Sequence, residues 1–207
     1  MKKAFIAIVA LSLVFIFGNF IYLNYSKWEY NVQPVNISGT LIPKGKNLPA
    51  FILNDGSGSF DDSRLLNRWS IMFFGYTRCP DICPNTLSIL NKMYKQVDDL
   101  PRKKRPQVLF ISVDSEHDTN DTPNKYAKYF NKNFTGLSGT EAQLDSLTKG
   151  LGVVSTKVQV SADNYIYDHS STLFIINPKG QLQAILSAPF TAEQLAKDYR
   201  VLLNKYS

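Results

Sequence analysis

The sequence predicts a single layered α/β domain, and three observations support that fold class. The chain has 207 residues, of which 44% are hydrophobic and 19% charged, so it can bury one substantial core. Short apolar runs alternate along the chain with segments whose apolar residues recur every three or four positions. The sequence holds no internal repeat or low-complexity tract, and nothing in it calls for a second domain.

The stretch SIMFFGYTRCPDICPNTL lies at the centre of this prediction. Residues 71–74 form an apolar run that ends at Gly75, which is typical of a buried strand. The loop that follows holds both cysteines of the chain, Cys79 and Cys83, and helical spacing continues over residues 84–99. A strand that delivers two thiols to the start of a helix is a thioredoxin-type arrangement.

The N-terminus predicts a membrane anchor at residues 4–23. All but three of these residues are apolar, and a helix of this length spans about 30 Å, the thickness of a bilayer core. Two lysines precede the run, so we expect residues 1–3 in the cytoplasm and the domain outside. A cleaved signal peptide is the alternative, but no small-x-small cleavage site follows the apolar run.

The segment after the anchor is polar and rich in turn residues. We expect residues 24–47 to form a tether that leads into an N-terminal hairpin, and residues 48–207 to form the domain. A first strand is predicted at residues 51–53, ended by a turn at residues 54–56, with a connector at residues 60–69.

The rest of the chain alternates strands and helices, which favours a layered α/β architecture. A helix at residues 140–149 is expected to end at Gly150, and the last helix to begin after an N-cap at Thr191. The further strands are predicted at residues 107–113, 153–160, 172–176 and 181–187, and the helices at residues 123–131, 140–149 and 191–203.

The charge balance is mildly basic, with a formal net charge of +6. The cluster Arg102–Arg105 accounts for much of it and is most simply a solvated loop. A docking patch for an acidic partner or an anionic lipid is the alternative. Nucleic-acid binding is not expected, because no recognition motif or aromatic interleaving accompanies the cluster.

Two cysteines spaced four residues apart permit two interpretations. Outside the cytoplasm, Cys79 and Cys83 can form a structural disulfide. Such a short loop adds little stability when closed, and the adjacent helix N-terminus favours a thiolate. We therefore expect a redox-active dithiol.

A histidine is the remaining candidate for a metal ligand. His169 precedes the strand predicted at residues 172–176, and in a thioredoxin-like sheet that loop packs beside the dithiol loop. His169 can then approach both sulfurs. The alternative is a histidine that forms hydrogen bonds within a loop and binds no metal. His117 lies among acidic residues and is expected in a solvated loop.

Two thiolates and one imidazole form a mostly soft, three-coordinate ligand set that suits copper. Thiolates select Cu(I), and an imidazole also suits Cu(II). Because such a site keeps one side open, an acceptor's ligands can enter before the donor's leave. Three acidic residues are candidates for the surrounding shell of hydrogen bonds: Asp81, Asp114 and Asp168.

Three motifs resemble those of the Sco/SenC family. GYTRCPDICPNTL at residues 75–87 resembles the family signature GYTxCPDxCPxxL. SVDSEHDT at residues 112–119 resembles SVDPxRDT, and DHSSTLFIINPKG at residues 168–180 resembles the DHS-strand-DPxG stretch. The matches follow family order and spacing, and cover the domain from Leu48 to Leu203.

This resemblance implies a thioredoxin-like fold with an added hairpin, and copper bound by Cys79, Cys83 and His169. Family members assist assembly of the dinuclear copper centre in cytochrome c oxidase subunit II, and some instead reduce the cysteines of that subunit. Two departures fall in one loop, where Ser115 replaces the usual proline and His117 a frequent arginine.

The resemblance and the anchor together predict a metallochaperone in the bacterial inner membrane, with its domain in the periplasm. Since an oxidising compartment favours the disulfide, a thioredoxin-like reductant is expected as a second partner. A periplasmic thiol–disulfide oxidoreductase is the alternative function. A peroxiredoxin-like peroxidase fits less well, because Thr77 lies two residues before Cys79, whereas that family places its threonine three residues before.

Overall fold

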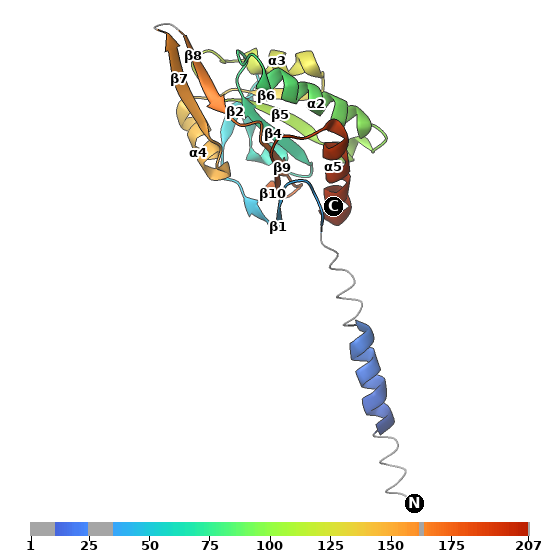
Figure 1. Cartoon of the computed structure of the whole chain (residues 1–207). Helices are drawn as coiled ribbons and strands as arrows, with labels where there is room; N and C mark the ends of the chain where they lie inside the picture. Colours follow the sequence, from blue (N-terminus) through green and yellow to red (C-terminus); the bar gives the residue numbers. More distant parts are fainter. Residues whose placement is uncertain (1–10, 25–34, 162–163, 207) are drawn as a thin grey trace, which may run out of the picture. The chain divides into compact units, whose positions relative to one another are not determined.

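The computed structural model describes residues 11–24, 35–161 and 164–206 of the chain. Contacts between Cα atoms divide the chain into two units, Met1–Val35 and Asn36–Ser207. The second unit contains every labelled helix and strand (Figure 1).

The described part of the first unit is helical over residues 11–24. Within the described residues, no helix is both long enough and apolar enough to cross a bilayer. The predicted anchor at residues 4–23 falls partly outside these residues, as do residues 1–3 and much of the expected tether.

A six-stranded mixed sheet forms the centre of the second unit, in the order β1-β10-β9-β4-β5-β6. Strands β4, β5 and β6 run parallel, whereas β9, β10 and β1 are joined by antiparallel pairing. In the order of the sheet, the strands are β1 Thr40–Asn47, β10 Gln181–Leu186, β9 Leu173–Ile176, β4 Ser70–Gly75, β5 Gln107–Ser112 and β6 Phe134–Leu137.

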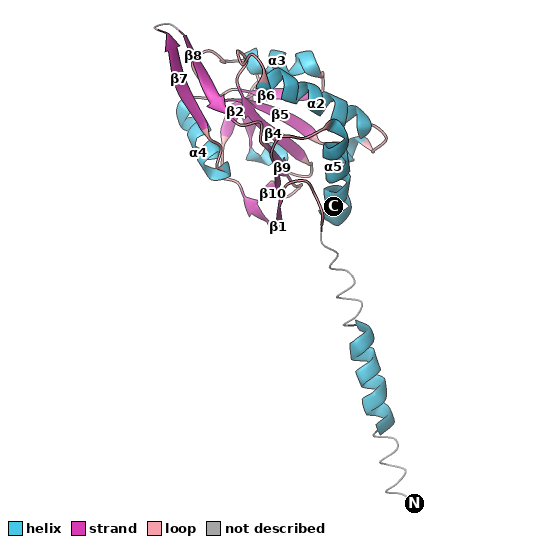
Figure 2. Cartoon of the chain, in the orientation of Figure 1, coloured by secondary structure: helices cyan, strands magenta, loops and turns pink. Residues whose placement is uncertain are grey.

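Two hairpins and several helices surround this sheet (Figure 2). The hairpins are β2 Ile52–Asn54 with β3 Ser59–Asp61, and β7 Ser155–Ser161 with β8 Asn164–His169. The α-helices are α2 Ile82–Gln96, α3 Thr122–Phe130, α4 Glu141–Leu151 and α5 Ala192–Tyr206, and the short 3-10 helices are η1 Asp62–Leu65 and η2 Arg102–Lys104. This architecture confirms the predicted α/β class, and β2–β3 is the expected N-terminal hairpin.

Both faces of the central strands are buried, which explains their continuous apolar sequence. On one face, Met72 and Phe74 of β4 join a core cluster that includes Leu144 and Leu147 of α4. The side chains that alternate with these lie on the other face, where β5 packs against α3. The Phe73 ring lies 6.0 Å from Phe110, which in turn lies 5.3 Å from Tyr126 of α3.

The structure differs from the sequence prediction in four places. Strand β6 was not predicted, because no strand was expected between the helices at residues 123–131 and 140–149. Strand β1 lies within the segment expected as a tether, so the folded part begins before residue 48. Helix α4 continues through Gly150 to Leu151, because Gly152, with φ +70°, provides the left-handed C-cap. His169 is the last residue of β8 rather than part of a loop.

Candidate metal centre

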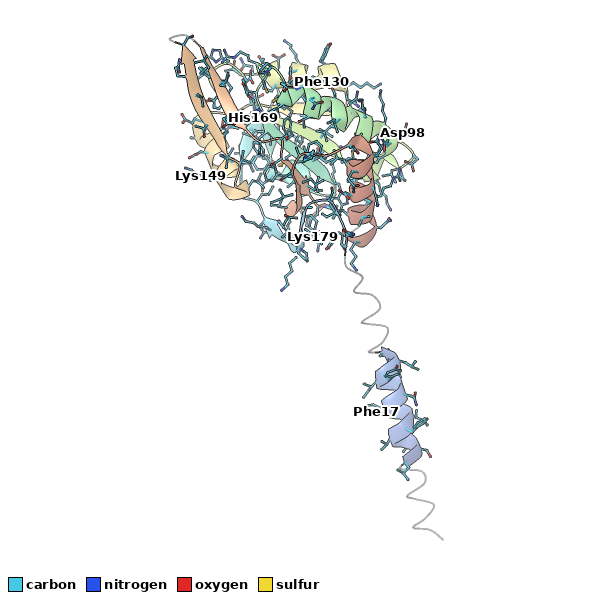
Figure 3. The ribbon with its side chains drawn as sticks, in the orientation of Figure 1. Phe17, Asp98, Phe130, Lys149, His169 and Lys179 are labelled. Atoms are coloured by element: carbon cyan, nitrogen blue, oxygen red, sulfur yellow. The ribbon has the colours of Figure 1, made fainter. Side chains whose placement is uncertain are left out.

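Cys79, Cys83 and His169 come from three different elements and meet at one point. Cys79 lies in the loop after β4, Cys83 in the first turn of α2, and His169 at the end of β8. One ligand atom from each lies within 4.8 Å of the other two, and all three residues are buried. Figure 3 labels His169, which ends β8, and its ligand atom lies within 4.8 Å of that of Cys83 at the start of α2.

The first turn of α2 holds the Cys79 sulfur. The backbone N–H of Cys83 donates to Cys79 Sγ at 3.4 Å, which is the role an N-cap side chain usually has. The residue at the N-cap position, Asp81, forms no such hydrogen bond with its side chain. A hydrogen bond from the Cys83 thiol, together with backbone N–H groups, lowers the pKa of Cys79 far below its ordinary value. Cys79 is therefore the thiolate of the pair.

Cys83 is the fully buried member of the pair, with 0% of its surface exposed. Burial, and then the neighbouring Cys79, raise the pKa of Cys83, so this thiol keeps its proton when no metal is bound. Gly75 at the end of β4 provides the space for its sulfur, because a Cβ there would lie 2.4 Å from Cys83 Sγ. Neither cysteine is in a disulfide.

The imidazole of His169 presents Nε2 to the sulfurs, 3.4 Å from Cys83 Sγ. Its other nitrogen, Nδ1, lies 3.2 Å from the carbonyl oxygen of Ser170. Because a carbonyl can only accept, Nδ1 bears the proton and Nε2 is left with a lone pair for a metal. The rings of Phe73 and Tyr76, with centroids 6.2 and 5.7 Å away, restrict its rotation.

The three acidic residues expected around the site lie in different environments. Asp81 and Asp168 are exposed, and Asp168 lies on the face of β8 opposite His169. Asp114 is fully buried after β5 and accepts hydrogen bonds from Tyr165 at 2.6 Å and Arg78 at 3.1 Å. Asp114 thus contacts the residue next to Cys79.

Burial alone raises the pKa of Asp114, but hydrogen bonds from Tyr165, Arg78 and His117 outweigh it and hold that pKa below its ordinary value. His117 was expected in a solvated loop. Its side chain is 46% exposed, but Nδ1 lies 3.4 Å from Asp114 and 2.5 Å from the Tyr165 hydroxyl. It belongs to a network beside the site.

Asp118 is a supporting residue that the sequence analysis missed. It is buried and accepts hydrogen bonds from the backbone N–H of Thr77 at 2.7 Å and the hydroxyl of Ser112 at 2.6 Å. Hydrogen bonds to Asp118 therefore hold the loop that leads to Cys79 against the loop after β5. The signal was available, since β4 and β5 were both predicted strands, and adjacent parallel strands end at the same edge.

The donor set decides what the arrangement can bind. Two sulfurs and one imidazole nitrogen suit soft or borderline metal ions, and thiolate ligands favour Cu(I) over harder cations. The lone pair of His169 and the thiolate of Cys79 are ready to coordinate, whereas Cys83 must lose its proton as the metal enters. The residues present therefore fit a copper ion.

Comparison with known proteins gives the same assignment. The family model described as SCO1/SenC matches residues 42–204. A relative from Stutzerimonas stutzeri is 34% identical over 160 residues, which are 76% of this chain and 77% of that protein. The chain spans about half the length of mitochondrial relatives from Arabidopsis thaliana and Bos taurus.

Solved structures have the same fold. The solution structure of apo Sco1 from Thermus thermophilus is 34% identical, with a TM-score of 0.71, and the match covers 81% of this chain and 97% of that one. The crystal structure of yeast Sco1 with copper bound is 27% identical, with a TM-score of 0.71, covering 78% and 91%. With a family model matched over most of its length, this chain belongs to the SCO1/SenC family.

Proposed function

We propose that this chain is a copper metallochaperone that assists copper-centre assembly in cytochrome c oxidase subunit II. The observation that supports the proposal best is the convergence of Cys79, Cys83 and His169, whose ligand atoms all lie within 4.8 Å. Copper as the cargo is supported by the chemistry of these donors and by the copper-bound yeast relative. The oxidase as recipient rests on the family.

Transfer can proceed by stepwise exchange of ligands. Cys79 is 8% exposed, whereas Cys83 is fully buried, so an acceptor thiolate approaches on the Cys79 side. The acceptor's ligand enters the open side of the three-coordinate ion before His169 leaves. Cys79 and Cys83 then release the ion, and Cys83 takes back its proton because its pKa in the metal-free site is raised.

Thiol–disulfide exchange is the second candidate function, and the low pKa of Cys79 favours it. The Cys79 thiolate attacks a disulfide of the target protein and forms a mixed disulfide, which releases one target thiolate. Cys83 then loses its proton and attacks Cys79 Sγ, which releases the second thiol. The target gains two electrons, and the Cys79–Cys83 disulfide must be reduced again by a thioredoxin-like partner.

We also propose that residues 4–23 anchor the chain in a bacterial inner membrane, with the domain in the periplasm. The apolar sequence of this segment supports the proposal, as do the exposed apolar side chains of its described helical part, such as Leu11, Phe15 and Phe20. The positive-inside rule supports a cytoplasmic N-terminus.

Copper stoichiometry of the reduced full chain in detergent tests the first function. We expect one Cu(I) per chain, with the affinity lowered by at least tenfold in His169→Ala, because one of three ligands is lost. Tyr129→Ala is the matched control, since Tyr129 is 86% exposed on α3, and this variant should keep one tightly bound copper.

The same variants separate the two functions. Unchanged copper affinity in His169→Ala would contradict the three-ligand site. If that variant also still reduces a disulfide peptide at the unmodified rate, the oxidoreductase becomes the better description, because exchange needs only Cys79 and Cys83.

A further inference from the structure

The β7–β8 hairpin carries His169 and is attached to the domain mainly through side chains. In the described chain, the two strands pair only with each other and form a sheet separate from the six-stranded one (Figure 1). A cavity of about 290 Å³ is lined by Ser155 and Tyr167 of the hairpin and by Glu141 and Asp145 of α4. Side-chain contacts, among them that of Tyr167 with the core and with the Tyr76 ring, therefore fix the position of the hairpin in place of a strand ladder.

One buried side chain on β8 makes several of the contacts that do attach it. Tyr165 is 7% exposed, and the Arg78 guanidinium lies over its ring, 4.8 Å from the centroid. The Lys157 ammonium also lies over this ring at 3.9 Å, and Lys157 pairs with Glu116 at 2.5 Å. The Tyr165 hydroxyl donates to the buried carboxylate of Asp114, which also binds Arg78.

Arg78 and Tyr165, which contact each other, are each close in sequence to a metal ligand. Arg78 directly precedes Cys79 in the dithiol loop. Tyr165 and His169 are four residues apart on the same face of β8, about 13 Å along the strand. We infer that the contact between Arg78 and Tyr165 positions His169 at the two sulfurs and thereby slows the release of copper. This inference rests on the proposed function.

The inference concerns the rate of release more than the number of ligands. Without the Tyr165 ring, His169 is still held between the rings of Phe73 and Tyr76, so copper can bind. The hairpin, however, has lost its cation–π contact with the dithiol loop and its hydrogen bond to Asp114. We expect His169 to leave the ion more often, and Cu(I) release to become roughly tenfold faster, about the effect of one well-shielded cation–π contact.

The test measures the rate at which the Cu(I)-loaded full chain, in detergent, loses copper to an excess of a colour-forming Cu(I) chelator. Tyr165→Leu should release copper about tenfold faster than the unmodified chain. Tyr165→Phe keeps the ring under both cations, and its release rate should lie between those of Tyr165→Leu and the unmodified chain. Tyr129→Leu is the matched control, because Tyr129 is 86% exposed on α3. We expect Tyr129→Leu to release copper at the rate of the unmodified chain.

The same substitution made in the His169→Ala variant shows whether Tyr165 acts through His169. In His169→Ala, adding Tyr165→Leu should leave the release rate unchanged, whereas a purely structural effect would accelerate release again. X-ray absorption at the copper edge should show less imidazole scattering in Tyr165→Leu than in the unmodified chain.

The outcomes distinguish the inference from the function on which it rests. Release from Tyr165→Leu at the unmodified rate, while His169→Ala releases faster, would overturn only the inference, and so would equal acceleration in both backgrounds. If Tyr165→Leu does not fold, Arg78→Gln decides, since it removes the guanidinium from over the Tyr165 ring, and release at the unmodified rate in that variant would overturn the inference. Unchanged retention in His169→Ala would instead contradict the proposed three-ligand site.

Discussion

Gly75 is the position where the smallest possible change should disturb both the fold and the metal centre. A Cβ on Gly75 would lie 2.4 Å from Cys83 Sγ and 3.0 Å from the Phe110 ring. Since heavy atoms in contact prefer about 3.5–4.0 Å, Gly75→Ala requires the sulfur to move by roughly 1 Å or more. Cys83 is fully buried in the first turn of α2, so it can move only if its side chain rotates away or the helix shifts.

Overpacking of this kind costs about 1–3 kcal/mol of unfolding free energy. For a domain of this size, the melting temperature should fall by roughly 5 °C. A displaced Cys83 sulfur should also weaken Cu(I) binding by at least tenfold, or about 1.4 kcal/mol. Calorimetry of the reduced chain and a chelator competition assay measure the two effects separately.

Gly58→Ala provides the matched control, because no atom lies within 4 Å of the Cβ that it adds. In the double variant Gly75→Ala, Cys83→Ala the sulfur is absent. The loss of unfolding free energy in the double variant should therefore be smaller than the sum of the losses in the two single variants. Melting temperature and copper affinity in Gly75→Ala equal to those in Gly58→Ala would refute the steric argument.

Two further predictions concern ionisable groups. Because the pKa of Cys79 is lowered, its thiolate persists as pH falls, and alkylation of Cys79 by iodoacetamide should change little between pH 7.5 and 6.5, whereas an ordinary thiol slows by about tenfold. Cys83→Ala removes the largest cause of the shift and should restore a steeper dependence, and a tenfold loss in the unmodified chain would contradict the assignment. Asp114→Asn should lower the free energy of unfolding by about 2 kcal/mol at pH 7, because the buried carboxylate loses its charge-assisted hydrogen bonds. Since the pKa of Asp114 is lowered in the folded state, its contribution is complete above the ordinary carboxyl pKa and is lost as pH falls below it, so urea unfolding at pH 3.5 should show a smaller difference.

The parts of the fold that the sequence predicted are those where packing leaves a periodic pattern. Strands β4 and β5 are buried on both faces, which requires the continuous apolar runs from which they were predicted. The N-cap of α5 was also predictable, and the Thr191 hydroxyl accepts the N–H of Gln194 at 3.2 Å. In both cases the local sequence contains the cause of the structure.

Strands β1, β6 and β8 were missed because long-range contacts determine them, such as the pairing of β6 with β5. The sequence of β1, TLIPKGKN, has no apolar periodicity, since β1 is a mostly exposed edge strand held by backbone pairing with β10. In β8, the inward side chains are Tyr165, Tyr167 and His169, which are polar or aromatic residues that occur equally well in a loop. The alternation of these side chains indicates a strand only when the pairing of β8 with β7 is known.

The candidate site shows the same division between local and long-range causes. Cys79 and Cys83 could be placed from the local pattern of strand, loop and helix, and His169 was added by a topological argument and a family resemblance. The burial of Asp118 and Asp114 could not be predicted, because it results from the packing of the loop after β5, which the local sequence does not show.

The way the ligands are attached bears on how the site can work. Two buried carboxylates after β5 hold the dithiol loop, since Asp118 binds the backbone of Thr77 and Asp114 binds Arg78. The imidazole comes from a hairpin that pairs with no strand of the central sheet in the described chain. Two ligands are thus preorganised, whereas the third depends on side-chain contacts at the surface. A site that must release its metal benefits from this difference, because exchange can begin at the ligand whose displacement requires no rearrangement of the core.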